Sequence, residues 1–86
     1  MIIGMHHVTN AVVATGHKWE WFHPSGEDQL YIAVRCSPST AADVANSLMA
    51  WASALTNEKS KRAMVALLEN TCTEQRGENM FLFWRC

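Results

Sequence analysis

The chain has 86 residues, of which 49% are hydrophobic and 17% are charged, and its formal net charge is −1. This length and composition indicate one globular domain over residues 1–86, without a low-complexity stretch or a charged tail. A net charge near zero argues against broad, non-specific nucleic-acid binding, which usually requires a basic surface. No apolar run approaches the roughly 20 residues that cross a bilayer, and the first ten residues do not read as a signal peptide. We therefore expect a cytoplasmic protein that does not act at a membrane.

The first third of the chain has patterns that are typical of β-strands. Residues 11–16, AVVATG, are rich in β-branched side chains and end in a plausible tight turn, so we expect an extended segment there. Residues 17–22 and residues 29–36 both alternate, and the HPSGED sequence between them is a strong turn signal. We predict that these two runs form an antiparallel hairpin. Residues 1–8 fit either a further strand or a leading arm.

A helical period replaces the alternation after Pro38. Apolar side chains then recur at spacings of four, three and four, and Thr40 and Asp43 stand at the positions of an N-terminal capping box. A second apolar stripe follows, with Asn57 as its expected N-cap. This second helix should end before the TEQRGEN sequence of residues 73–79, in which Gly77 acts as a helix breaker. Residues 80–86, MFLFWRC, alternate again and predict a final strand.

These elements predict an α+β fold. Its sheet is mainly antiparallel with three to four strands, and two consecutive helices pack on one face of it. The predicted order is β-β-β-α-α-β.

The histidines and cysteines are the candidate metal-binding and catalytic groups of the chain. On a strand, six residues separate His17 from His23 by roughly 20 Å, too far for both to bind one zinc ion. The three cysteines, Cys36, Cys72 and Cys86, have no C-x-x-C spacing, and a Cys36–histidine nucleophile has no supporting motif. The chain also lacks a nucleophile elbow, a phosphate-binding loop and a dinucleotide fingerprint. We predict no metal, no cofactor and no enzymatic activity.

The two faces of the predicted sheet differ in composition. We expect the helices to cover the face that carries Trp19, Trp21, Leu30, Ile32, Val34, Leu82 and Trp84, with Trp51 from the first helix. The opposite face then carries the aromatic side chains of Phe22, Tyr31, Phe81 and Phe83, among Lys18, Glu20, Arg35 and Arg85. Two helices cover only one side of a small sheet, so this second face has more aromatic surface than a solvated face needs.

Four arrangements would satisfy the second face. Two copies of the chain could pack there as a homodimer, or another protein could dock on its aromatic and arginine side chains. Single-stranded nucleic acid could stack on the rings, although the net charge and the absence of an RNP-like run disfavour this. Alternatively, the N-terminal segment could fold over this face and close it.

A basic cluster at the start of the second helix is a separate candidate. Lys59, Lys61 and Arg62 stand where the helix dipole disfavours cations, so they could contact a phosphate or an acidic protein surface. The favoured interpretation is a solvated face with Glu58 as partial compensation, because charge runs are usually solvated.

The sequence therefore predicts a small non-enzymatic protein-binding module that self-associates through its aromatic sheet face. An inhibitor or regulator fits this description, and a phage- or mobile-element-encoded inhibitor of a host defence complex, of the anti-CRISPR kind, is one concrete version. The alternative is a single-stranded nucleic-acid-binding module that uses the same face. The predicted partner-binding residues are Phe22, Tyr31, Arg35, Lys59, Lys61, Arg62, Phe81, Phe83 and Arg85.

Overall fold

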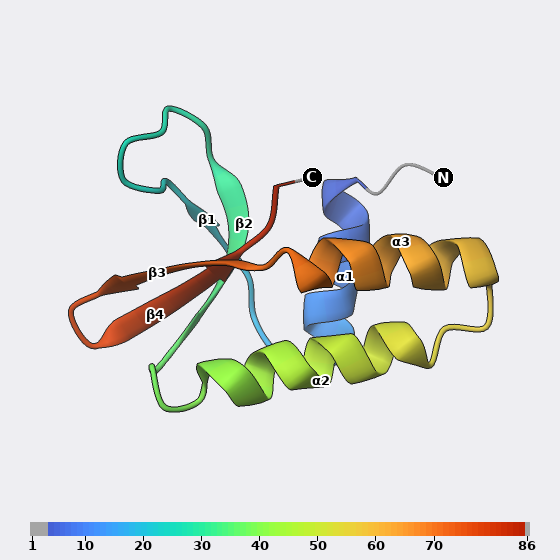
Figure 1. Ribbon diagram of the computed structural model, residues 1–86. Helices are drawn as coiled ribbons and strands as arrows, with labels where there is room; N and C mark the ends of the chain where they lie inside the picture. The colour runs from blue at the N-terminus through green and yellow to red at the C-terminus, as the bar shows by residue number, and fades with distance from the viewer. Residues whose placement is uncertain (1–3, 86) are drawn as a thin grey trace.

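The computed structural model describes residues 4–85, so the predictions for residues 1–3 and Cys86 lie outside the described residues. Figure 1 shows the helices gathered at one end of a sheet whose β3–β4 hairpin extends away from them. The elements in chain order are α1 (Met5–Ala14), β1 (Glu20–Phe22), β2 (Tyr31–Cys36), α2 (Ala41–Ser53), α3 (Glu58–Glu69), β3 (Cys72–Arg76) and β4 (Asn79–Phe83).

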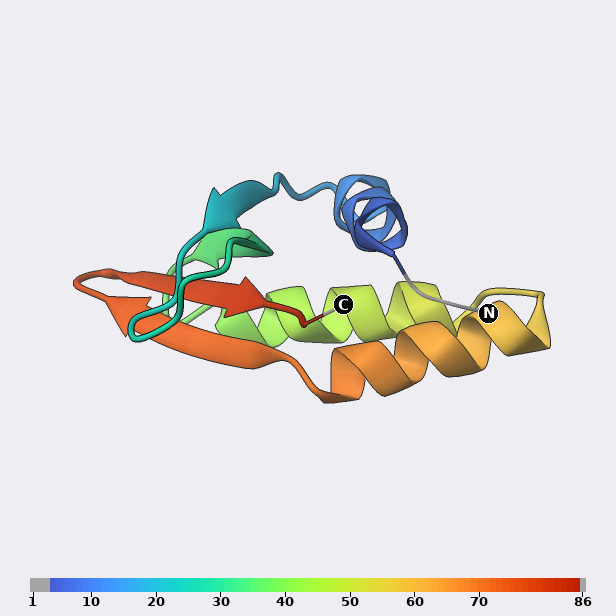
Figure 2. The same ribbon diagram turned by 90° about the horizontal axis from the view of Figure 1, so that it is seen from above.

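The sheet has four strands in the order β1-β2-β4-β3, and every neighbouring pair is antiparallel. The predicted α+β class, the β1–β2 hairpin and the two consecutive helices α2 and α3 are confirmed. The C-terminal run also forms a strand, as predicted, and β4 pairs with β2 in the centre of the sheet. In Figure 2, α2 and α3 run side by side and α1 lies across from them.

The N-terminal segment is helical, so the prediction that residues 11–16 are extended is wrong. Val8, Ala11 and Val12 stand on one side of α1, where all three are buried. This helix packs against α2 and β2, and burial of the stripe outweighs the weak β preference of the paired valines. Gly16, at a φ of 83°, supplies the left-handed residue that ends the helix, and the His17 amide donates to the Val12 carbonyl at 3.0 Å.

The strand β3 is a further difference from the predicted order, which has no strand between the second helix and residue 80. It is a polar outer strand, paired with β4 through a two-residue turn of Gly77 and Glu78. Gly77 has a φ of 58°, which suits the first position of a type II′ hairpin turn. Gly77 is therefore a hairpin residue rather than a helix breaker, and the observed order is α-β-β-α-α-β-β.

The main hydrophobic core lies between the helices and one face of the sheet. Its buried members are Val8, Ala11, Val12, Ile32, Val34, Val44, Leu48, Ala52, Met64, Leu68, Leu82 and Trp84, with Trp51 packed partly buried against them. The predicted placement of Ile32, Val34, Leu82 and Trp84 under the helices is therefore confirmed.

Three other side chains predicted for this core are exposed. Trp19, Trp21 and Leu30 keep 37%, 51% and 58% of their surface accessible. Trp21 lies opposite Ile32 in the register, so it does stand on the helix side of the sheet. However, α1 and α2 contact the central strands β2 and β4, and the outer strand β1 extends past the covered part of this face.

The two helix N-termini predict a difference in stability between two alanine variants. The Asn57 side chain accepts a hydrogen bond from the Ser60 amide at 3.0 Å, as predicted for an N-cap. Thr40 makes no such bond to α2, and its hydroxyl donates instead to the Ser37 carbonyl at 3.2 Å. We expect Asn57→Ala to lower the free energy of unfolding by about 1 kcal/mol and Thr40→Ala by clearly less. Urea unfolding of both variants checks this, and equal losses would contradict the assignment of the caps.

Candidate protein-binding surface

The aromatic face of the sheet lies opposite the helices and forms a second, smaller core. We use the name aromatic face for the six residues of this smaller core: Phe22, Tyr31, Ala33, Cys72, Phe81 and Phe83. The Phe22 and Phe81 rings stack with centroids 4.5 Å apart, and Phe22 and Phe83 are only 3% and 4% exposed. The expectation that this face lacks a cover is therefore wrong.

Its cover comes from the β1–β2 loop, residues 23–30, and not from the N-terminal segment. The loop is drawn at the upper left of Figure 1, and Pro24 within it is fully buried. The N-terminal helix α1 joins the main core on the helix side instead. Two arginine clasps, one from Arg76 and one from Arg85, hold the loop against the sheet.

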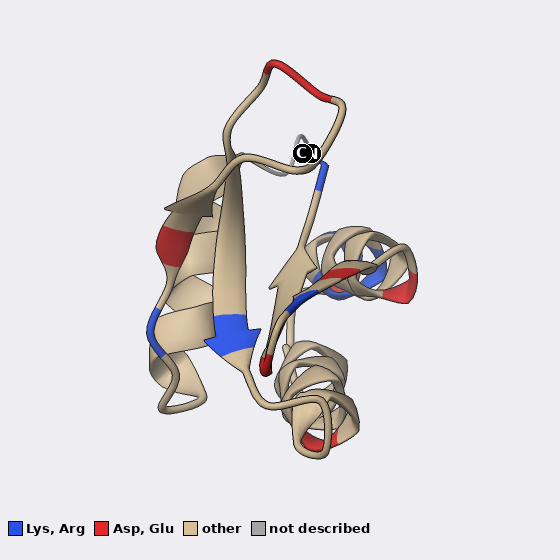
Figure 3. Cartoon of the chain, turned by 90° about the vertical axis from the view of Figure 1, so that its left-hand side faces the viewer, with Lys and Arg blue, Asp and Glu red and all other residues tan. Residues whose placement is uncertain are grey.

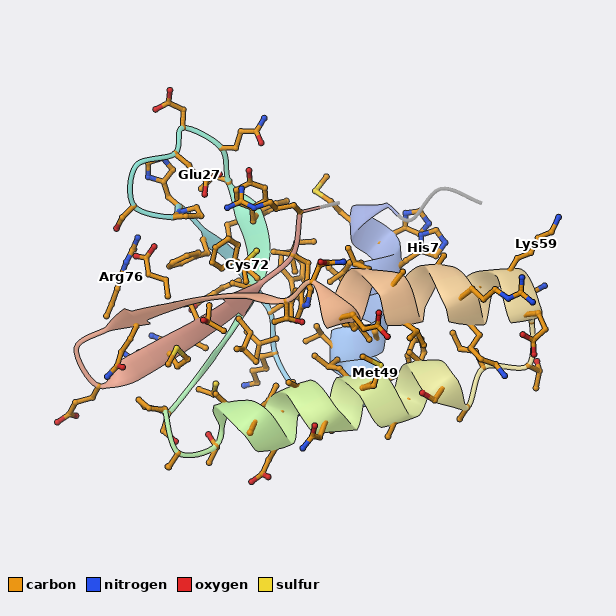
Figure 4. The ribbon with its side chains drawn as sticks, in the orientation of Figure 1. His7, Glu27, Met49, Lys59, Cys72 and Arg76 are labelled. Atoms are coloured by element: carbon orange, nitrogen blue, oxygen red, sulfur yellow. The ribbon has the colours of Figure 1, made fainter. Side chains whose placement is uncertain are left out.

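The first clasp connects the loop to β3. Arg76 donates to the His23 carbonyl and to the Glu74 carboxylate, both at 2.6 Å. Glu74 in turn accepts from the amide and the hydroxyl of Ser25, at 3.0 and 2.9 Å. The Arg76 guanidinium also lies 4.4 Å from the centre of the Phe22 ring, a distance typical of a cation–π contact. Figure 4 shows Arg76 reaching from β3 toward this loop.

The second clasp connects the loop to the C-terminal end of β4. Both carboxylate oxygens of Glu27 accept from Arg85, one of them at 2.7 Å. Arg85 also donates to the Tyr31 hydroxyl at 3.0 Å, and this hydroxyl donates to Glu27 at 3.1 Å. The Arg85 guanidinium lies 5.1 Å from the centre of the Tyr31 ring. Arg85 therefore packs over Tyr31 of the aromatic face, as Arg76 packs over Phe22. A bidentate pair of this kind fixes the orientation of both side chains.

The clasps predict an acid-sensitive stability. Hydrogen bonds from Arg85 and from the Ser25 amide, respectively, hold the pKa values of Glu27 and Glu74 below their ordinary value of 4.5. A lowered pKa in the folded state stabilises the protein above the unfolded-state pKa, and this contribution is lost as the pH falls toward the folded-state pKa. The free energy of unfolding should thus fall as the pH drops below about 4.5.

Unfolding curves between about pH 6 and about pH 3 check this prediction. The double variant Glu27→Gln/Glu74→Gln should show a shallower acid decline than the wild type. For the variant Glu78→Gln, in the β3–β4 turn outside both clasps, the free energy of unfolding should fall with pH as it does for the wild type. A double variant with an unchanged acid decline would show that the clasps do not contribute.

The predicted partner-binding residues fall into separate places. Phe22 and Phe83 are interior side chains beneath the loop, Tyr31 and Phe81 are half-buried beside them, and Arg85 is engaged in a clasp. The remaining predicted residues, Arg35, Lys59, Lys61 and Arg62, lie outside this cluster. The aromatic side chains of the set are thus mainly part of a core, and they do not form an open surface.

The basic cluster of α3 stands far from the aromatic face. Figure 4 shows Lys59 at one end of the molecule and Arg76 at the other, and the molecule is 38 Å long. Glu58 lies 3.2 Å from Lys61 and 3.9 Å from Arg62. The cluster is therefore partly neutralised by its own helix.

An exposed aromatic surface lies instead at β1 and the two residues before it. Trp19 and Trp21 contact each other edge to face, with ring centroids 5.5 Å apart. A hollow of about 300 Å³ beside them is lined by Lys18, Trp19, Glu20 and Arg35. Glu20 and Arg35 form an ion pair at 3.4 Å within it. We call these five residues, Lys18, Trp19, Glu20, Trp21 and Arg35, the tryptophan edge.

The tryptophan edge combines the side chains that dominate protein interfaces with an open strand. Tryptophan and arginine are enriched at interface hot spots. In the described part of the chain, no strand pairs with the outer side of β1. Figure 3 shows β1 at the outside of the molecule, with an acidic position in it and a basic position in the segment before it. Sequence reasoning found the two tryptophans but assigned them to the core, so only Arg35 of this surface was predicted.

Other kinds of site have little support in the described residues. Within residues 4–85, no group of three or more acidic, histidine or cysteine side chains could hold a metal ion. His17 instead hydrogen-bonds to Ser47 of α2 at 3.0 Å. Burial raises the pKa of the Cys36 thiol, which makes this residue a weaker nucleophile at neutral pH. No helix in the same range is long and apolar enough to cross a membrane.

Comparisons of the chain with protein-family models, with curated proteins and with solved structures found no match.

Proposed function

We propose that the protein is a small, non-enzymatic protein-binding module that acts by docking its tryptophan edge on a protein partner. The observation that carries this proposal is the exposed pair of Trp21, in the outer strand β1, and Trp19, just before it. A soluble chain seldom leaves two neighbouring tryptophans open unless they are buried by a partner. An inhibitor or regulator, including one of the anti-CRISPR kind, belongs to this class, and a cytoplasmic location stays a prediction.

The charges of the tryptophan edge support a protein partner over a nucleic acid. Lys18 and Arg35 are accompanied by Glu20, which forms an ion pair with Arg35 and reduces the local positive charge. A surface that tracks a phosphate backbone gains from several unopposed cations. Of the aromatic rings that the nucleic-acid alternative would use, Phe83 is buried, and Tyr31 and Phe81 are half-buried beside it.

Site-specific photo-cross-linking in source cells tests the proposal. A benzophenone amino acid at position 21 should form an adduct with a protein, whereas the same group at Val13, which is also exposed but lies on α1, should not. Excess unlabelled wild type should compete the adduct away, and the variant Trp19→Ala/Trp21→Ala should not.

Two outcomes would overturn the proposal. The first is an equal adduct yield from positions 21 and 13, which would indicate non-specific contact. The second is an adduct with nucleic acid that is competed by single-stranded DNA or RNA, which would favour the alternative module.

A further inference from the structure

We infer that the occupant of the tryptophan edge is a second copy of this chain, paired antiparallel through residues 18–20 at the start of β1, with Trp19 on the two-fold axis. This inference rests on the proposed function, because it names the partner of the same surface. It also places self-association at the outer strand, since the aromatic face is closed by its own loop.

The charge pattern around Trp19 is self-complementary. In an antiparallel pair centred on Trp19, Lys18 of each chain lies directly opposite Glu20 of the other. Side chains directly opposite one another share a face of the sheet, and unlike charges in this position stabilise the pair. The two-fold axis creates this contact twice, so one lysine and one glutamate in each chain form two ion pairs in the dimer.

Neighbouring registers lack this complementarity. A pair centred on Glu20 would place the two Glu20 carboxylates opposite each other, and a pair centred on Lys18 would do the same with two ammonium groups. A pair centred on Trp21 would place Glu20 opposite the apolar Phe22. The register centred on Trp19 is thus the one that the side chains of this segment favour.

The surroundings of Lys18 and Glu20 are consistent with this register. Within residues 4–85, Lys18 has no carboxylate at ion-pair distance, and its side chain lines the open hollow beside Trp19. Glu20 already forms an ion pair with Arg35 at 3.4 Å, so Lys18 of the second copy would complete a network of three charged side chains. Pairing would also bury part of Trp19 against its own copy and would give the open side of the sheet a partner at Glu20, the first residue of β1.

Sedimentation of the purified chain over a range of concentrations tests the inference. We expect a reversible monomer–dimer equilibrium that weakens in high salt, because the ion pairs are near the surface. Lys18→Glu places a glutamate opposite Glu20, and Glu20→Lys places a lysine opposite Lys18. Each variant should raise the dimer Kd about tenfold or more. Glu69→Lys, an equal change of charge to Glu20→Lys at an exposed position of α3, should leave the Kd at the wild-type value.

Mixing the two charge variants gives the sharpest result. An equimolar mixture of Lys18→Glu and Glu20→Lys places unlike charges opposite each other again, so the dimer should form with about the wild-type Kd. Circular dichroism checks that each variant is folded. If Glu20→Lys does not fold, Trp19→Ala replaces it, and this change on the two-fold axis should also raise the Kd about tenfold.

The inference is overturned by a chain that stays monomeric at every concentration, or by a dimer whose Kd responds to none of these changes. Either failure leaves the proposed function to its own test. A cross-link from position 21 to a different protein would support the binding module with another partner. Absence of any specific cross-link would reject the module itself.

Discussion

Replacing Phe22 with alanine should lower the free energy of unfolding by about 3 kcal/mol or more. Phe22 is 3% exposed, and its ring stacks on Phe81. The Arg76 guanidinium lies 4.4 Å from the centre of the Phe22 ring. The variant would leave a cavity at the centre of the aromatic face, and the first clasp would lose the ring beneath it. Urea unfolding, at a protein concentration dilute enough for the chain to be monomeric, measures the loss.

The adjacent residue supplies the matched control. Trp21→Ala removes a larger side chain from the same strand, yet Trp21 is half exposed, so the expected loss is about 0.5 kcal/mol or less. The sequence pattern by itself favours the opposite ranking, with Trp21 in the core and Phe22 on an open face. A larger loss for Trp21→Ala than for Phe22→Ala would therefore contradict the arrangement of the sheet.

Replacing Trp84 with alanine should be the most damaging change in the main core, with an expected loss of about 3–5 kcal/mol. Trp84 is fully buried, and it follows β4 at the point where the sheet meets the helices. Its indole nitrogen donates to the Thr71 hydroxyl at 2.8 Å, and this hydroxyl donates to the Leu68 carbonyl at 2.6 Å. The side chain thus connects the C-terminal segment to the end of α3.

Two milder variants separate the packing of Trp84 from its hydrogen bond. Thr71→Val leaves the buried indole N–H unpaired and should cost about 1–3 kcal/mol. Trp84→Phe removes this donor together with part of the ring, so its loss should lie between that of Thr71→Val and that of Trp84→Ala. Thermal and urea unfolding of the three variants gives the order. A loss for Trp84→Ala no greater than for Thr71→Val would indicate that the ring is not packed as described.

Much of the fold could be predicted from local patterns. The alternation around HPSGED predicts the β1–β2 hairpin, and the change of period after Pro38 predicts α2 and α3. Asn57 was correctly predicted as the N-cap of α3, because its short side chain is suited to accept a hydrogen bond from the first turn. Each of these signals depends on residues close together in the chain.

The two elements that sequence reasoning missed depend on partners far along the chain. The paired valines of α1 are β-branched, and the helix forms because its stripe packs against α2 and β2. The polar residues of β3 have little intrinsic strand preference, and they are extended because β4 offers its backbone across a tight turn.

The candidate surface shows the same division. Lys18, Trp19, Glu20 and Trp21 alternate in the sequence, and this alternation already determines that the two tryptophans share one face and the two charges share the other. It cannot determine which face is covered, because that depends on where the helices end relative to an outer strand.

The sequence by itself therefore determined the α+β class, the hairpin, the two consecutive helices and the charge pattern of residues 18–21. Only the tertiary structure decided that the aromatic face is closed by its own loop and that the tryptophans stay open. The physical reason is that burial depends on contacts between distant segments. Arg76 and Arg85 close one face by reaching residues 23–27 from more than 50 positions away, and no nearby pattern encodes that contact.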